Sequence, residues 1–133
     1  MSRGEYPATR MRRNRMKAFS RRLVAENSIS IDDLIWPLFV IEGKGNIEPV
    51  TSMPGVNRLS IDQLVEKTGL ARSLGIPAVA IFPSIDPAQK DAVGSLARDD
   101  DNLVCRAVAA VRAAHPNLGI ICDVALDPFT DHG

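Results

Sequence analysis

Short apolar runs alternate with amphipathic helical patterns along most of the chain, and this order restricts the fold more than any other feature. The first run, Leu34 to Ile41, predicts a strand. Its paired part is expected to be Leu38 to Ile41, because Pro37 has no N–H to donate to a ladder. Two further runs, Ala78 to Phe82 and Gly119 to Leu126, are bounded by prolines and also predict strands. The order strand, helix, strand, helix, strand favours parallel strands joined by right-handed crossovers.

Two helical patterns fill the intervals between these strands. Ser60 and Gln63 have the spacing of a capping box, and Gly75 provides a stop, so a helix is expected between them. Its apolar face would consist of Ile61, Leu64, Val65, Thr68 and Ala71. The acids at 99–101 suit the start of the second helix, which should end at His115 before Pro116. Its stripe would consist of Val104, Ala107, Val108 and Val111.

Two carboxylates, Asp123 and Asp127, interrupt the third apolar run. Side chains alternate across a strand, which predicts one face shared by Ile121, Asp123, Ala125 and Asp127, with Cys122, Val124 and Leu126 on the other. A carboxylate in an apolar strand costs several kcal/mol unless it is paired, hydrated or functional. We therefore predict a polar cavity beside Asp123 and Asp127. The alternative is a structural pair of acids that backbone donors or an Arg satisfy.

Two α/β architectures fit the order of elements. A doubly wound sheet usually has a Gly-rich phosphate turn and a helix directly after its first strand, but Glu42 to Asn46 opens a long loop that reaches Leu59. A (β/α)8 barrel collects its site at the carboxyl ends of its strands, where Asp123 and Asp127 lie. The barrel is favoured. Because a closed barrel takes about 250 residues and eight strands, we expect only about its first three strands within residues 30–133.

Composition excludes several classes of protein. No apolar segment approaches the roughly 20 residues of a membrane span, and the polar amino terminus lacks the apolar core of a secretory signal, so a cytoplasmic location is predicted. The two cysteines, Cys105 and Cys122, fit no metal-ligand spacing and no disulfide framework. Both lie in periodic apolar segments and are expected to be buried, structural thiols.

Residues 1–29 form a basic arm. Residues 1–22 contain eight of the 16 basic residues and one acid, Glu5. The basic residues are Arg3, Arg10, Arg12, Arg13, Arg15, Lys17, Arg21 and Arg22. Such an arm could bind nucleic acid, but its only aromatics are Tyr6 and Phe19 and it has no nucleic-acid-binding motif. Contact with an acidic surface of a neighbouring subunit is preferred, and the spacing of Met16, Phe19, Leu23 and Val24 indicates a short helix.

Five ordered motifs together resemble the porphobilinogen synthase family, also called 5-aminolevulinate dehydratase. They are Arg12-Arg-Asn-Arg15, Leu34 to Val40, Ser52 to Ser60, Lys90-Asp91, and Cys122 to Gly133. The resemblance implies a TIM barrel with an amino-terminal arm that wraps a neighbouring subunit in a homo-octamer or smaller assembly. It also implies the condensation of two 5-aminolevulinate molecules to porphobilinogen in tetrapyrrole biosynthesis, with no nucleic-acid or membrane partner.

The resemblance assigns few residues. Asp123 matches an active-site aspartate that accepts hydrogen bonds from a substrate amino group and assists proton transfer. Asp127 is the second candidate catalytic residue. In zinc-dependent members the positions of Ala125 and Asp127 are cysteines that hold zinc, so this sequence resembles the aspartate-rich, zinc-independent branch. We expect no active-site zinc, no metal ligand among these residues, and any magnesium at a regulatory site outside the chain.

The family mechanism also needs two lysines that form Schiff bases. The chain contains Lys17, Lys44, Lys67 and Lys90, and none matches. The chain is therefore expected to be an amino-terminal portion that is inactive alone. Two interpretations without covalent chemistry stay open at this point, a small α/β cation-binding module and an assembly protein. His132 could carry a proton and Lys90 could belong to a lid, although solvated loop positions are the simpler expectation for both.

Overall fold

The computed structural model describes residues 4–5, 7–9 and 12–133. The chain divides into two compact units, Met1–Ser30 and Ile31–Gly133. Six residues of the predicted arm lie outside the described residues, among them Arg3, Tyr6 and Arg10.

The first unit contains a 3-10 turn, η1 (Arg13–Arg15), and a short helix, α1 (Ala18–Leu23). The expected helix therefore forms. The apolar side chains Phe19 and Leu23 of this helix, and Met16 just before it, are all exposed in this chain.

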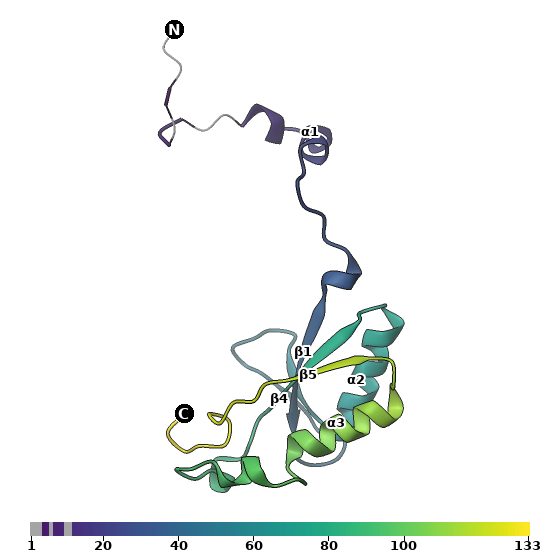
Figure 1. Ribbon diagram of the computed structural model, residues 1–133, viewed down its shortest axis with the longest axis vertical. Coiled ribbons are helices and arrows are strands. Elements are labelled where there is room, and N and C mark those ends of the chain that lie inside the picture. The colour runs from purple at the N-terminus through teal and green to yellow at the C-terminus, as the bar shows by residue number, and fades with distance from the viewer. Residues whose placement is uncertain (1–3, 6, 10–11) are drawn as a thin grey trace. The chain divides into compact units, whose positions relative to one another are not determined.

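The second unit is a five-stranded sheet with two helices (Figure 1). Its elements are η2 (Ile31–Asp33), β1 (Ile35–Ile41), β2 (Ile47–Pro49), β3 (Asn57–Ser60), α2 (Ile61–Ser73), β4 (Ala78–Pro83), η3 (Pro87–Gln89), η4 (Ser95–Arg98), α3 (Leu103–Ala114) and β5 (Gly119–Cys122). The strand order is β2-β3-β1-β4-β5, in which only the β2–β3 pair is antiparallel. The crossovers through α2 and α3 advance in the same direction, which places both helices on one face.

The core lies between that face and the two helices. The parallel register sets Leu38 beside Ile81 and Trp36 beside Val79, so one set of side chains from every parallel strand points toward the helices. These meet Leu64 of α2 and the stripe of α3 in one cluster. The cluster consists of Leu38, Val40, Leu59, Leu64, Ala71, Val79, Ile81, Ile85, Leu103, Ala107, Val111, Leu118 and Phe129.

No helix of the second unit covers the opposite face of the sheet. The rings of Phe39 and Phe82 meet there at a centroid distance of 6.0 Å, while Ile35 and Ile121 stay exposed. A doubly wound sheet would carry helices on both faces, whereas a barrel wall carries them only outside. The one-sided cover fits the wall of a barrel.

The strand count differs from the prediction because the loop 42–59 contains a hairpin. β2 and β3 pair across a turn in which Val50 N–H donates to Val56 O at 2.9 Å. β2 has only three residues, all exposed, and so shows no alternation that could reveal it. The three strands that were predicted correspond to β1, β4 and β5.

The prediction that β1 is paired only from Leu38 was wrong. β1 pairs with β4 from Ile35 to Val40, with Pro37 opposite Ala80. On its other side β1 meets β3 only from Phe39 onward. Pro37 is tolerated because β1 has one neighbour at that level, so the missing N–H breaks no ladder.

The predicted capping box is also absent. Ser60 is the N-cap of α2, but its hydroxyl donates to Asp62 Oδ1 at 2.6 Å instead of accepting from a backbone N–H of the first turn. The start of α3 is capped by Asn102, whose side chain accepts from Cys105 N–H at 3.0 Å, and not by the acids at 99–101. Gly75 follows Leu74, the C-cap of α2, and has a φ of 80°, as expected for a glycine that stops a helix.

Two glycine substitutions should shift stability in opposite directions. A Cβ at Gly119 would lie 2.9 Å from Ala78 Cβ and 3.1 Å from Pro77 O, so Gly119→Ala should lower the free energy of unfolding by about 1–3 kcal/mol. A Cβ at Gly69, inside α2, would meet the His115 ring at an ordinary 3.5 Å, so Gly69→Ala should raise it by about 0.5–1 kcal/mol. Urea unfolding measures both, and equal effects would contradict this packing of β5 on β4.

Candidate active site at the carboxyl ends of the strands

The two predicted site acids follow β5 and do not lie within it. β5 ends at Cys122, whose partner Ile81 is the last paired residue of β4 on that side. The prediction of a strand to Leu126, with Asp123, Ala125 and Asp127 on one face, was therefore wrong. β5 has a single neighbour, and a turn at 126–130 takes over, in which Phe129 N–H and Thr130 N–H donate to Leu126 O.

Both carboxylates are exposed at the end of the sheet where a barrel places its chemistry. Asp123 is the first residue after β5, and Asp127 begins the turn. Among the described residues neither carboxylate has a hydrogen bond or an ion pair with protein atoms. The acids are thus free to accept hydrogen bonds from a bound molecule.

A second segment, the loop 84–102, meets the acid-bearing segment at this edge. Asp91 forms a parallel bridge with Thr130, in which Asp91 N–H donates to Phe129 O at 3.4 Å and Asp131 N–H donates to Asp91 O at 3.2 Å. Figure 1 shows the green loop and the yellow carboxyl-terminal segment side by side. The bridge makes the two loops one structural unit.

Asp91 itself was not predicted as a functional residue. Its Oδ1 accepts from Val93 N–H and from Ser95 N–H, both at 3.0 Å. Hydrogen bonds from Ser95, first from its side chain and then from its backbone, hold the pKa of Asp91 below the ordinary value. The available signal was the spacing of Asp91, Gly94 and Ser95, which is typical of a side-chain-closed turn.

The loop that follows β1 is anchored from α2. Asp62 accepts from Gly45 N–H at 2.9 Å, and the buried Ser60 hydroxyl accepts from Asn46 N–H at 2.9 Å. The Ser60 hydroxyl is the largest cause that holds the pKa of Asp62 below its ordinary value. The carboxyl end of β1 is therefore tied to the start of the next helix.

An ion pair closes the same edge from α3. The Arg106 guanidinium donates to Glu42, the residue directly after β1. That hydrogen bond is the main cause that raises the pKa of Arg106. α3 is thus tied to the carboxyl end of β1.

The remaining candidates have modest surroundings. His132 is exposed, with Nε2 3.3 Å from Ala92 O, and Lys90 is half-buried in the loop 84–102. Cys105 and Cys122 are exposed, so the expectation of buried thiols was wrong. Cys105 lies on the side of α3 away from the buried Ala107 and Val111. The pKa of Cys122 is raised, mainly by partial burial of the Cys122 thiol and to a smaller extent by Cys105.

The described part of the chain holds no group of three or more His, Cys, Asp or Glu side chains placed to bind a metal ion. Ala125 contributes no ligand atom beside Asp127, and a lone carboxylate does not make the thiolate-rich set that zinc prefers. These residues therefore do not fit a zinc centre.

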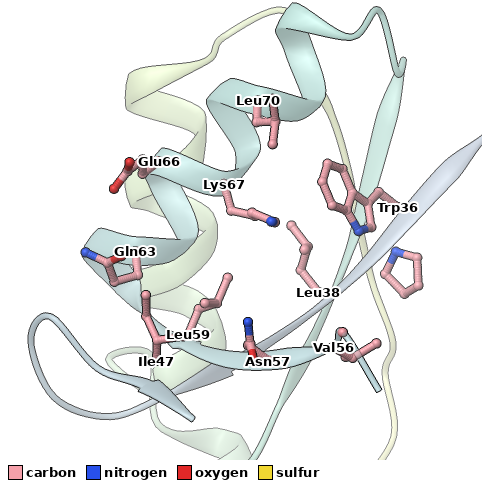
Figure 2. A pocket seen from close by; sticks show the side chains of 12 residues that line it. Trp36, Leu38, Ile47, Val56, Asn57, Leu59, Gln63, Glu66, Lys67 and Leu70 are labelled. Atoms are coloured by element: carbon pink, nitrogen blue, oxygen red, sulfur yellow. The ribbon is translucent and has the colours of Figure 1, made fainter. Parts of the chain in front are cut away.

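A pocket of about 330 Å³ lies elsewhere, between α2 and the first halves of β1 and β3 (Figure 2). Lys67 of α2 reaches across it, with Nζ 5.2 Å from the centroid of the Trp36 ring. Neither Asp123 nor Asp127 lines it. Trp36 packs against the core cluster, and Lys67 stabilises it by about 0.5–1 kcal/mol through a cation–π contact.

The fold and the polar carboxyl edge define a segment of an α/β barrel. A family model described as Delta-aminolevulinic acid dehydratase matches residues 8–133. The delta-aminolevulinic acid dehydratase of Bradyrhizobium diazoefficiens is 52% identical over 126 residues, which cover 95% of this chain and 36% of the relative. That of Halalkalibacterium halodurans is 47% identical over 124 residues, which cover 93% and 37%.

A solved structure agrees. The crystal structure of the Toxoplasma gondii enzyme in complex with its reaction product porphobilinogen matches with a TM-score of 0.80 and 40% identity, over 92% of this chain and 34% of that one. The chain belongs to the delta-aminolevulinic acid dehydratase (porphobilinogen synthase) family, and the predicted barrel fold class is confirmed. It spans a little over a third of the length of these curated relatives. No helix in the described ranges has the length and apolarity needed to cross a bilayer.

Removing the Ser60 hydroxyl should loosen the anchored loop. Ser60→Ala leaves Asn46 N–H without its acceptor and should lower the free energy of unfolding by about 1–2 kcal/mol. It should also raise the pKa of Asp62 toward 3.8, measured by NMR titration. The lowered pKa of Asp62 stabilises the fold at a pH above the ordinary pKa of the carboxyl. This contribution is lost as the pH falls through the pKa that Asp62 has in the folded chain. Because Ser60→Ala lacks most of it, the variant should lose less stability in acid than the parent chain.

Ser73→Ala is the matched control, because Ser73 is exposed near the end of α2 and its hydroxyl only donates to Leu70 O. An unchanged Asp62 titration in Ser60→Ala would contradict the assigned cause.

Proposed function

We propose that this chain provides the aspartate-bearing part of a porphobilinogen synthase active site. The reaction condenses two molecules of 5-aminolevulinate to porphobilinogen with loss of two waters, in tetrapyrrole biosynthesis. The observation that carries the proposal is the position of Asp123, directly after a barrel strand within a segment matched to the family from residue 8 to 133. The Toxoplasma relative, whose structure contains porphobilinogen, supports this choice of product.

Asp123 and Asp127 are the proposed catalytic residues. An exposed carboxylate without a protein partner can accept hydrogen bonds from the amino group of a bound 5-aminolevulinate and can receive or return protons there. Asp123 is given the first role because it matches the family's active-site aspartate. Asp127, four residues later in the turn, is proposed to assist from the same edge.

The proposed site works without zinc. The residues at 125 and 127 do not fit a zinc centre, so no step is assigned to that metal. Magnesium, where it acts, is proposed to bind at a regulatory site outside residues 1–133.

The basic arm is proposed to join subunits. It presents exposed apolar side chains at Met16, Phe19 and Leu23 among basic residues, while the rest of the chain has an excess of acids. A homo-octamer or a smaller homo-oligomer, without nucleic acid or membrane and in the cytoplasm, is the proposed state.

The isolated chain should form no covalent adduct with substrate. None of its four lysines matches a Schiff-base position; Lys67 stands over the Trp36 ring and Lys17 and Lys44 are exposed. Borohydride reduction with 5-aminolevulinate followed by mass spectrometry should find an unmodified chain. The positive control is a chimaera in which residues 8–133 replace the matching segment of the Bradyrhizobium relative. An adduct on the isolated chain would overturn this prediction.

In that chimaera the two aspartates should control turnover. Asp123→Asn and Asp127→Asn remove a proton acceptor, so each should lower kcat for porphobilinogen formation by about 100-fold or more. Asp100→Asn changes an exposed acid of the loop 84–102 and should leave kcat unaltered. Full kcat in Asp123→Asn would refute the catalytic assignment, and an inactive parent chimaera would count against the proposed function.

A further inference from the structure

We propose that Asp91 is a positioning residue for the reaction, because it closes the turn 91–95 that holds the segment 126–131 and, with it, Asp127. The inference rests on the proposed function and adds a residue that touches neither substrate nor the reacting atoms. Asp91 acts through backbone groups of the acid-bearing segment, and three observations support this role.

The first observation is the turn itself. One carboxylate oxygen of Asp91 receives both Val93 N–H and Ser95 N–H at 3.0 Å, and Gly94 N–H donates to Asp91 O at 3.4 Å. Hydrogen bonds to an ionised acceptor are about twice as strong as neutral ones. The side chain of Asp91 therefore fixes the direction in which its own backbone N–H and C=O point.

The second observation is where those backbone groups go. Asp91 N–H donates to Phe129 O, and Asp91 O accepts from Asp131 N–H, so both flank Thr130 in the parallel bridge. Gly94 is buried against the same segment: a Cβ there would lie 3.5 Å from Phe129 Cβ and from Thr130 Cγ2. The turn thus contacts 126–131 through hydrogen bonds and through close packing.

The third observation is how little else holds the acid-bearing segment. After Cys122 no strand pairing continues, Val124 is fully exposed, and Leu126 is 57% exposed. Thr130 is buried, but its hydroxyl has no hydrogen-bond partner in the described structure, so its side chain adds no polar anchor. Phe129 in the core, the bridge to Asp91 and, one residue beyond the segment, the contact of His132 Nε2 with Ala92 O at 3.3 Å are what remain. Since a catalytic group displaced by about 1 Å can cost 100-fold in rate, the bridge bears directly on Asp127.

A matched pair of variants in the chimaera tests the proposal. Asp91→Ala should speed hydrogen exchange of the Asp131 N–H about tenfold or more. It should also lower kcat by about 10- to 100-fold, with a smaller change in KM. Asp91→Asn keeps an oxygen acceptor, so its Asp131 N–H exchange rate and its kcat should both stay close to those of the parent chimaera. Asp86→Ala is the control, because Asp86 closes a similar turn in the same loop by accepting from Ala88 N–H at 2.9 Å but makes no bridge.

The rate is expressed per active site, counted by borohydride trapping of substrate, so that loss of folded protein does not imitate loss of positioning. Unchanged kcat per trapped site in Asp91→Ala, with faster Asp131 exchange, would overturn the positioning role and leave the proposed function intact. Unchanged exchange would overturn the bridge as the means of action. An unsubstituted chimaera that makes no porphobilinogen counts against the proposed function and thereby against this inference.

Discussion

The structure depends on the burial of one face of a parallel sheet under two helices. Leu38, Val79 and Ile81 are almost fully buried on that face, and Leu64, Ala107 and Val111 enclose them from α2 and α3. Burying the larger of these side chains contributes about 1.5–3 kcal/mol each. The cluster also sets the register of the strands, because a slip by one residue would turn these side chains to the other face. The positions of the strand ends, where the site acids follow, are consequences of that register.

Much of this could be predicted from the sequence because the core leaves periodic patterns. The stripe of α3 and the apolar face of α2 appear at helical spacing, and the runs at 35–41 and 78–83 are rich in branched side chains. Capping was less predictable, because the hydroxyl of Ser60 has two available uses. It donates to Asp62, which accepts from Gly45 N–H, and it accepts from Asn46 N–H itself. Only the three-dimensional approach of that loop shows why this arrangement forms. Likewise, β2 gains its pairing from β3 and not from its own three exposed residues.

The position of the two candidate acids in the fold could be predicted in part. Asp123 and Asp127 do follow the last strand, but alternation was extended four residues beyond the point where β5 loses its partner. An apolar sequence such as Val124-Ala-Leu126 indicates a strand only when neighbours are present, and beside β5 the described residues supply one neighbour. Asp91 escaped prediction for a related reason. Its turn is readable from local residues, whereas its bridge to Thr130 joins positions 39 residues apart in sequence.

The end of β5 at Cys122 has a chemical consequence for the acids that follow. A carboxylate inside the strand would face the same side as Ile121 and Phe82, an apolar surface on which desolvation disfavours the ionised form. Placed after the strand, Asp123 and Asp127 stay in contact with water in this chain and need no protein partner. The cost is conformational, because a segment released from the sheet has to be held by other means. Phe129 in the core and the backbone of Asp91 contribute to that hold, so the freedom of the exposed acids is limited again by the loop that precedes α3.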